Sequence, residues 1–444
     1  MNRVRRSPES GTSLEAPLLV VGVAALGFNL RGAIAGLPPV FPELQARLHL
    51  SNAEISVLAA TPVICFGVVS AFAAPVARRL GEEWTLFLAT LALVAGLLLR
   101  AAAPGALLFP GTILACAGIA VMNVLLGSLI KRRWPERAGF LVGLYITTLS
   151  LGAIVASVAS VPIYDATGKS LSVTLGWLIV PAALGAALWL PQLRARGAAR
   201  RPGPKPDDPT PSTDATPPDP GARAPAGHPG TWWIWRHAVA WQVAFFMGMQ
   251  SLLYYATISW LPTILRDRGV SADGAGFLLG VLGVGNLALA LVTPVLAQRM
   301  RSQHALVVPI VIGIAVGTAG AVWAPIGSVV VWMLILGAAQ NAALGVAIYL
   351  MVARAPDPAI AASLSAMSQS VGYLLASLGP LEVGLLHSVT GGWNVPVTVL
   401  LVLTVALLAA GLLAARPGTL PSAPGTGHAT PGDKRQSERK VAGH

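Results

Sequence analysis

Residues 41–51, FPELQARLHLS, have a counterpart in the second half of the chain at residues 261–271, LPTILRDRGVS. The alignment places Pro42 on Pro262 and Ser51 on Ser271, and each segment directly follows a long apolar stretch. A second pair, APVARRL at 74–80 and TPVLAQRM at 293–300, recurs at nearly the same offset. Two matches at one offset predict a chain built from two parallel structural repeats.

The composition places these repeats in a membrane. The chain has 444 residues, of which 55% are hydrophobic and only 11% are charged, and its mean hydropathy is +0.69. Soluble domains carry about 25% charged residues. Apolar runs of roughly 20 residues, long enough to cross a bilayer, recur along the chain. We therefore expect an all-α polytopic membrane protein.

The apolar runs predict twelve transmembrane helices in two pseudo-symmetric six-helix bundles. These helices are expected at 16–39, 53–77, 83–102, 106–130, 138–162, 172–192, 238–264, 274–297, 304–323, 327–351, 360–386 and 392–415. Residues 194–235 are rich in Pro, Gly and Ala and lack apolar periodicity, which predicts a disordered linker. The expected domains are a cytoplasmic tail (1–15), a bundle (16–193), the cytoplasmic linker (194–235), a second bundle (236–416) and a disordered cytoplasmic tail (417–444).

The basic residues predict the orientation of the chain. Of the 30 Lys and Arg residues, 24 fall in the tails, the linker and the loops on one side of the expected bilayer. By the positive-inside rule this bias places both termini and the linker in the cytoplasm. We interpret the net charge of +12 as a topology signal rather than a nucleic-acid patch. The N-terminal RVRR and apolar stretch imitate a cleavable signal peptide, but Arg31 interrupts the apolar stretch, so we favour an uncleaved first helix.

Four segments are similar to one family of transporters. They are NLR at 29–31, SLIKRRWPERAGFLVGLY at 128–145, SWLPTIL at 259–265 and MSQSVGYLLASLGP at 367–380. They resemble the cyanate/2-nitroimidazole transporter branch (CynX/NimT-like) of the major facilitator superfamily (MFS). The resemblance implies alternating access of two bundles around a site near the bilayer midplane, and a small substrate such as cyanate or a nitroimidazole. It leaves uptake and export equally open.

Two segments depart from patterns typical of the superfamily. The usual Gly-x-x-x-Asp-Arg-x-Gly-Arg-Arg loop reads AAPVARRLGEEW at 73–84, with Arg78 at the Asp position and Glu82 and Glu83 at the arginine positions. This difference removes the usual charge relay of that loop. The Pro-containing pattern of drug/proton antiporters is absent from LYITTLSLGAIVASV at 144–158, which counts against multidrug efflux.

Arg31 is the strongest candidate for a substrate-binding residue. It is the only charged residue between Pro17 and Val40, and an arginine near the middle of a bilayer costs several kcal/mol even on lenient scales. At about 1.5 Å per residue it lies near the midplane, so we expect it to face a water-filled cavity. Gly27 and Ala35, one turn to either side, are expected to leave room there. The alternative is a structural arginine tied to backbone carbonyls or to a carboxylate.

Uncharged polar and aromatic residues recur at helical spacing on other predicted helices. Around a single arginine they suit a small, planar, polar or monoanionic ligand, although each can equally hold two helices together. These further candidates are Asn123, Tyr145, Gln250, Tyr254, Gln340, Gln369 and Tyr373.

Two other polar residues, Asn29 and Glu382, are candidates either for a role in ion coupling or for a purely structural role. Asn29 is two residues from Arg31 and points roughly opposite to it on a helix, so we interpret it as an interhelical hydrogen-bonding residue. Glu382 is a carboxylate within the expected span 360–386, near its extracellular end, where it either couples protons or lies solvated at the outer rim.

The leading hypothesis is a secondary active transporter of the cytoplasmic membrane. It would move a small polar or monoanionic solute, cyanate-like or nitroimidazole-like by resemblance, with protons as a candidate coupling ion. The alternatives are a proton-coupled exporter of small amphipathic drugs and a non-translocating membrane sensor. Cys65 and Cys116 lie in apolar segments, and the spans contain no nucleophile–base pair or metal-ligand cluster. We therefore expect no enzyme, catalytic residue, cofactor or metal site, and a monomer whose partners are the substrate and the lipid bilayer.

Overall fold

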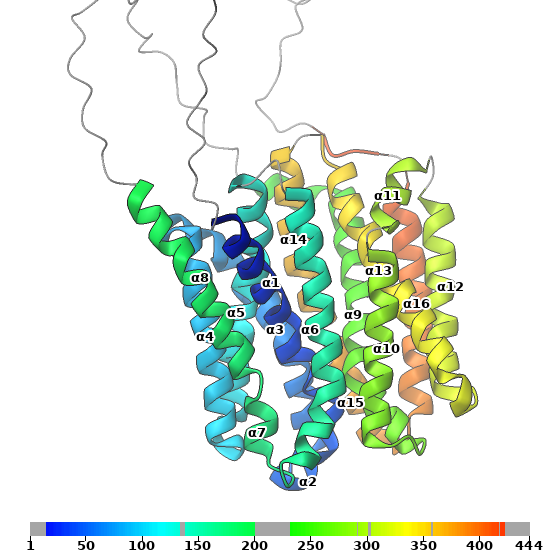
Figure 1. Ribbon diagram of the computed structural model, residues 1–444. Helices are drawn as coiled ribbons and strands as arrows, with labels where there is room; N and C mark the ends of the chain where they lie inside the picture. Colours follow the sequence, from blue (N-terminus) through cyan, green and yellow to red (C-terminus); the bar gives the residue numbers. More distant parts are fainter. Residues whose placement is uncertain are drawn as a thin grey trace, which may run out of the picture.

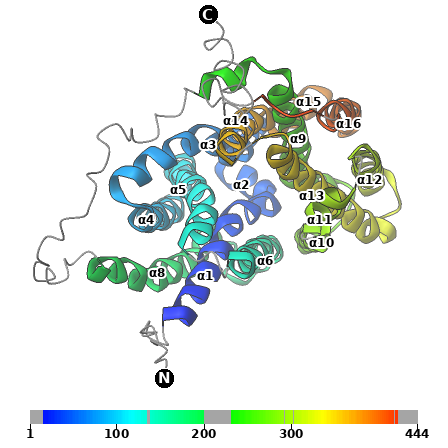
Figure 2. The ribbon, with the colours of Figure 1, turned by 90° about the horizontal axis from the view of Figure 1, so that it is seen from above.

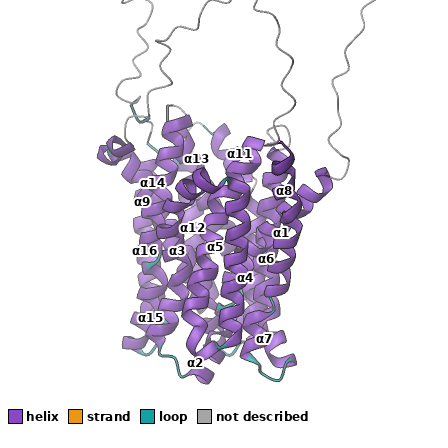
Figure 3. Cartoon of the chain, turned by 90° about the vertical axis from the view of Figure 1, so that its left-hand side faces the viewer, coloured by secondary structure: helices purple, strands orange, loops and turns teal. Residues whose placement is uncertain are grey.

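The computed structural model describes residues 15–133, 138–199, 231–290, 292–300, 303–356, 358–416 and 418–421. In these ranges the chain is helical, without a strand (Figures 1 and 3). The first helices in sequence form one bundle and the later ones a second bundle beside it, as Figure 2 shows from above. The expected all-α fold is thus confirmed at the level of secondary structure and arrangement.

The first bundle holds the helices that precede residue 200. They are α1 (Glu15–Ala35), η1 (Pro38–Val40), α2 (Phe41–Leu48), α3 (Asn52–Leu80), α4 (Glu82–Ala102), α5 (Pro104–Arg133), α6 (Ala138–Ala166), α7 (Leu171–Gly176) and α8 (Ile179–Ala199). The second bundle follows the short helix η3 (Thr231–Arg236). Its helices are α9 (Ala238–Asp267), α10 (Ala272–Ala290), α11 (Val292–Arg299), α12 (His304–Trp323), η4 (Ile326–Ser328), α13 (Val329–Ala353), α14 (Pro358–Ala376), α15 (Leu378–Thr390) and α16 (Asn394–Ala414).

Ten of the described helical segments are long and apolar enough to cross a membrane. The two remaining expected spans correspond to α9, which has 30 residues, and to the consecutive helices α14 and α15. α9 packs against α14 and α16, and α15 packs against α3 and α9, so both lie inside the helix arrangement. Together with the ten segments above, they arrange the described residues as the twelve expected spans in two bundles.

The repeat found in the sequence recurs in the backbone. After α2 the N–H of Leu50 donates to the carbonyl of Gln45 (3.3 Å), and after α9 the N–H of Val270 donates to the carbonyl of Leu265 (3.0 Å). Each turn is followed by a serine whose hydroxyl accepts from the N–H three residues further on, Ser51 before α3 and Ser271 before α10. The two bundles thus repeat the same helix–turn–helix corner.

We call the end of the molecule near α2 and α7 the α2 end, and the opposite end, where α8 ends and α9 begins, the linker end (Figure 1). The prediction of disorder over 194–235 is wrong at both of its edges. α8 continues to Ala199, because Leu, Arg and Ala are good helix formers. η3 is held in place because Ile234 is 2% exposed and packs with Ile360 and Leu364 of α14. Residues 200–230 lie outside the described ranges.

The expected disorder of the tail from residue 417 onward is also wrong for its first residues. The N–H of Leu420 donates to the carbonyl of Arg354 (2.8 Å), and the Leu420 side chain is buried. It belongs to the linker-end cluster, defined by the buried residues Ile234, Ala240, Ile360, Leu364, Met367 and Leu420. The composition of the tail is polar overall, and composition alone does not indicate that a single residue, Leu420, packs into an apolar cluster. The predicted tail segments 1–14 and 422–444 lie outside the described ranges.

Candidate functional site

The bundles meet mainly where α3 packs against α14 and α15 and where α6 packs against α10. Glycines on α10 allow the close approach to α6. A Cβ added to Gly276 would lie 2.7 Å from the Ser157 carbonyl oxygen, and one added to Gly280 would lie 2.7 Å from a methyl carbon of Val158. Such distances leave no room for a side chain. The two bundles are therefore in tight contact on the side toward the α2 end.

Toward the linker end, the same two helices carry exposed apolar side chains. On α6, Leu151 lies one turn from the packed Ile154 and is 48% exposed, and Phe140 is 63% exposed. On α10, Val284 lies one turn beyond Gly280 and is 50% exposed. The tight glycine contacts of the α6–α10 interface thus lie toward the α2 end, and exposed apolar side chains follow toward the linker end.

An ion pair connects the bundles at the closed end. Nη1 of Arg266, near the end of α9, donates to both carboxylate oxygens of Glu43 on α2, at 2.7 and 2.9 Å. Beside it the rings of Phe41 and Trp260 meet edge to face, with centroids 6.4 Å apart. Charge and ring contacts therefore add to the helix packing that closes this end.

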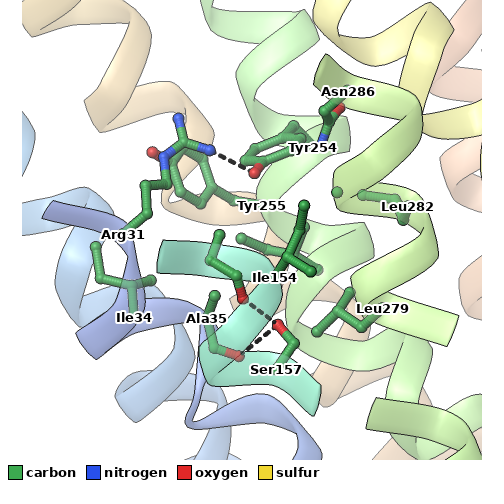
Figure 4. Close-up of a pocket in the computed structure, with 13 residues that line it drawn as sticks. Arg31, Ile34, Ala35, Ile154, Ser157, Tyr254, Tyr255, Leu279, Leu282 and Asn286 are labelled. Atoms are coloured by element: carbon green, nitrogen blue, oxygen red, sulfur yellow. Dashed lines mark hydrogen bonds between the residues drawn. The ribbon is translucent and has the colours of Figure 1, made fainter. Parts of the chain in front are cut away.

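A cavity lies between the bundles, bounded by α1, α6, α9 and α10 (Figure 4). It contains about 420 Å³ of empty space, open mouth included. Its walls are mostly apolar. The lining residues are Arg31, Ile34, Ala35, Ala153, Ile154, Ser157, Tyr254, Tyr255, Ile258, Leu279, Leu282, Gly283 and Asn286.

Arg31 supplies the positive charge of the cavity from the first bundle. Its Nη1 donates to the hydroxyl of Tyr254 in the second bundle, and its Cζ lies 5.1 Å from the centroid of the Tyr254 ring. The tyrosine therefore offers both an acceptor oxygen and a π face to the guanidinium. Among the described residues no carboxylate forms an ion pair with Arg31. Its charge is thus available to an anionic or strongly polar solute.

An aromatic group surrounds this arginine on the side of α3 and α14. The ring of Tyr255 lies 5.2 Å from that of Tyr254 and 6.4 Å from those of Phe66 and Tyr373, while Phe66 and Tyr373 are 5.5 Å apart, all measured between centroids. Such contacts fix ring orientations. The candidate Tyr373 therefore belongs to the wall behind the cavity-lining tyrosines.

The other sequence-based candidates lie at different distances from the cavity. Tyr145 donates to the side-chain oxygen of Asn123 (3.1 Å), and Asn123 is exposed. Gln250 donates to Ser251 (2.6 Å) within α9, Gln340 donates to Thr257 (3.1 Å), and Gln369 donates to Ser365 (2.9 Å). None of these five candidates is among the residues that line the cavity. Gln340 joins two helices, as a purely structural interpretation requires.

The neighbours of Arg31 on α1 match the sequence-based interpretation only in part. Ala35 lines the cavity as expected. The expectation that Gly27 leaves room for a ligand is wrong, because a Cβ there would overlap the Thr148 side chain, and the glycine instead lets α1 approach α6. Asn29 donates to the carbonyl of Pro181 on α8 (2.9 Å), which is the interhelical bond expected of it. Glu382 is exposed on α15, away from the cavity lining.

Sequence reasoning missed three polar residues of the cavity, namely Ser157, Tyr255 and Asn286. Ser157 donates to the carbonyls of Ala153 (2.8 Å) and Ala35 (3.2 Å), so its hydroxyl hydrogen has protein partners. Asn286 could have been found, because it is the single side-chain amide in the apolar run VLGVGNLALA at 281–290. Nothing in the sequence distinguishes Ser157 from the other serines of its helix.

Comparison with known proteins gives the family context of this cavity. Residues 18–380 match the family model described as Major Facilitator Superfamily. The uncharacterized transporter YycB of Bacillus subtilis (strain 168) is 35% identical over 90% of this chain and 93% of its own. The 2-nitroimidazole transporter of Escherichia coli (strain K12) is 34% identical over 90% and 95%. The cyanate transport protein CynX of the same organism is 26% identical over 84% and 91%.

Solved structures of transporters share the arrangement of helices. A bacterial homolog of the human lysosomal transporter Spinster, in an inward-facing and unoccupied conformation, superimposes with a TM-score of 0.68 at 17% identity, over 90% of this chain and 96% of its own. The nucleoside transporter NupG gives 0.64 at 15% identity, over 90% and 99%. At these identities the likeness concerns the fold alone.

Proposed function

This chain belongs to the Major Facilitator Superfamily, and on that premise we propose that it is a secondary active transporter of a small polar or monoanionic solute. The observation that carries the proposal is Arg31, a cation in an inter-bundle cavity with no ion-pair partner among the described residues. A buried charge without a partner is costly. An anionic solute in the cavity would offset that cost by pairing with Arg31, and this pairing would strengthen its binding.

Alternating access would carry the solute across the membrane. The bundles are closed at the α2 end and separate at the linker end, which is the arrangement of one end state of a rocking carrier. With the positive-inside bias of the sequence, the linker end faces the cytoplasm of a bacterial inner membrane. The conformation of the structure is then open to the inside.

The names of the relatives supply the first solutes to test. One relative is called a 2-nitroimidazole transporter and another a cyanate transport protein. Both solutes are small: 2-nitroimidazole is a planar ring, and cyanate is a linear monoanion that would pair with Arg31. We propose a solute of this kind, moved with or against protons.

The test is counterflow of labelled cyanate, nitrate and 2-nitroimidazole in proteoliposomes. We expect Arg31→Gln to reduce transport by at least about a hundredfold, because a charge-assisted hydrogen bond in a site of low polarity contributes several kcal/mol. Arg31→Lys keeps the charge without the planar fork and should retain partial activity. Arg47→Gln is the matched control, since Arg47 is an exposed arginine on α2.

Transport of every solute at the wild-type rate by Arg31→Gln would contradict the proposed role of the arginine. A pH gradient imposed on the same vesicles tests the coupling ion. Solute accumulation that does not respond to that gradient would contradict proton coupling while leaving the transport proposal intact.

A further inference from the structure

Asn286 is the second polar residue of the cavity whose bonding is incomplete. It extends from α10 in the second bundle, across the Tyr254 ring from Arg31, which extends from α1 in the first (Figure 4). Its Oδ1 is buried and has no hydrogen-bond partner among the described residues. A buried acceptor left unpaired costs about 1–3 kcal/mol. Asn286 lines the cavity, so a solute bound beside it would supply a partner for this oxygen once the side-chain amide turns toward the solute.

The two ends of the cavity have complementary chemistry. Arg31 carries only donors and a positive charge. Asn286 contributes an unpaired acceptor through Oδ1. Ser157 does not need a hydrogen-bond acceptor from the solute, because its hydroxyl already donates to backbone carbonyls. A solute that satisfies both ends must carry an acceptor or negative charge at one edge and an N–H or O–H donor at another.

The space between the two ends has mostly apolar walls. Ile154 and Leu279 lie across it from the tyrosine side in Figure 4, and Tyr254 presents its ring between Arg31 and Asn286. Apolar and aromatic walls with a few placed polar groups are typical of small-molecule sites. A ring in the solute would pack against the Tyr254 ring, which a linear ion cannot do to the same extent.

From these observations we infer that Asn286 is a specificity-determining residue, which selects planar solutes bearing a hydrogen-bond donor opposite an anionic or acceptor group. This inference rests on the proposed function. A site built to hydrogen-bond an O–H or N–H group rejects an analogue without it far more strongly than an apolar pocket rejects a change of size. Within the small solutes proposed above, a ring that carries such a donor is therefore expected to be transported better than linear or donor-free ions such as cyanate and nitrate.

The experiment compares two solutes of nearly equal size, 4-hydroxybenzoate and 4-fluorobenzoate, which share a carboxylate and differ in the donor. Counterflow of each is measured in proteoliposomes with the wild-type protein, with Asn286→Leu and with Ser157→Ala. We expect the wild type and Ser157→Ala to prefer 4-hydroxybenzoate by at least about tenfold, the effect of one hydrogen bond of roughly 1.4 kcal/mol. Asn286→Leu should transport both at similar rates, with 4-fluorobenzoate undiminished.

The outcomes separate this inference from the proposed function. Equal transport of both solutes by the wild type, or a preference that survives in Asn286→Leu, overturns the role of Asn286 and leaves the transporter intact. No wild-type transport of either benzoate, together with transport of cyanate, overturns the ring-and-donor selectivity alone. No transport of any of these solutes overturns both proposals. Because Asn286→Leu could fail to fold, Asn286→Ser, which keeps an acceptor oxygen, is assayed beside it and should retain part of the preference.

Discussion

The two ends of the bundle interface are built from different kinds of contact. At the α2 end, glycines bring helix backbones together and the Glu43–Arg266 pair crosses between the bundles. At the linker end, the same faces of α6 and α10 carry exposed apolar side chains, and the described contacts of η3 and the 418–421 segment stay within the second bundle. The contacts at the α2 end therefore join the two bundles, whereas the described contacts of η3 and residues 418–421 at the linker end stabilise the second bundle alone.

The largest effect is expected from a side chain introduced at the closed end. Gly276→Val places methyl groups against the Ser157 carbonyl, where even a Cβ lies 2.7 Å away. Overpacking of this kind costs about 1–3 kcal/mol, so we expect transport to fall by about tenfold or more. Gly143→Val is the matched control, because a Cβ on Gly143 of the same interface helix α6 meets nothing within 4 Å. Equal losses in the two variants would show that the ends do not differ as described.

A smaller effect, on the equilibrium between the closed and open states of the α2 end, is expected from loss of the Glu43–Arg266 ion pair. Glu43→Gln leaves Arg266 with a neutral partner, and because both side chains are partly exposed, at 13% and 24%, we expect about a three- to tenfold shift toward opening at the α2 end. The readout is labelling of Ala35→Cys from the α2 side by an impermeant maleimide, with Cys65 and Cys116 replaced by alanine. Glu54→Gln is the control at the same end. If labelling rises no more in Glu43→Gln than in Glu54→Gln, the Glu43–Arg266 pair does not help to close the α2 end.

We expect that the linker-end cluster can be destabilised without changing access from the α2 end. Truncation after Pro417 removes Leu420 from the linker-end cluster, at a cost of about 2 kcal/mol for one buried leucine. We expect the second bundle to unfold at a lower temperature while labelling of Ala35→Cys from the α2 side stays unchanged. Truncation after Pro421 retains Leu420 and serves as the control. A change in labelling after the first truncation would mean that the linker end also regulates access.

The smallest effect concerns a bond inside one bundle. Asn29→Ala removes the bond to the carbonyl of Pro181 (2.9 Å), and such interhelical bonds contribute about 0.6 kcal/mol on average in membranes. We expect a slightly lower unfolding temperature, followed by circular dichroism in detergent, and unchanged solute specificity. A tenfold or larger change in the counterflow rate would instead place Asn29 in the transport cycle.

The fold was largely accessible from the sequence, because apolar runs and the repeat at 41–51 and 261–271 record helix length and connectivity directly. Arg31 was accessible for the same reason, as a lone charge in an apolar run is costly wherever it points. Gln250 and Asn286 show the limit. Both are amides on apolar helices, and only the rotation of each helix about its axis decides that Asn286 faces the cavity and Gln250 bonds within α9. That rotation is set by tertiary packing, including glycine contacts that helical periodicity does not encode.

The lone charge of Arg31 has an electrical consequence for the proposed cycle. An empty carrier holds one positive charge deep in the membrane, whereas a carrier loaded with a monoanion holds none there. A membrane potential acts on one elementary charge with about 2.3 kcal/mol per 100 mV when the whole field is crossed. A voltage would therefore act mainly on the step in which the empty protein returns, and current transients would be larger without solute than with it.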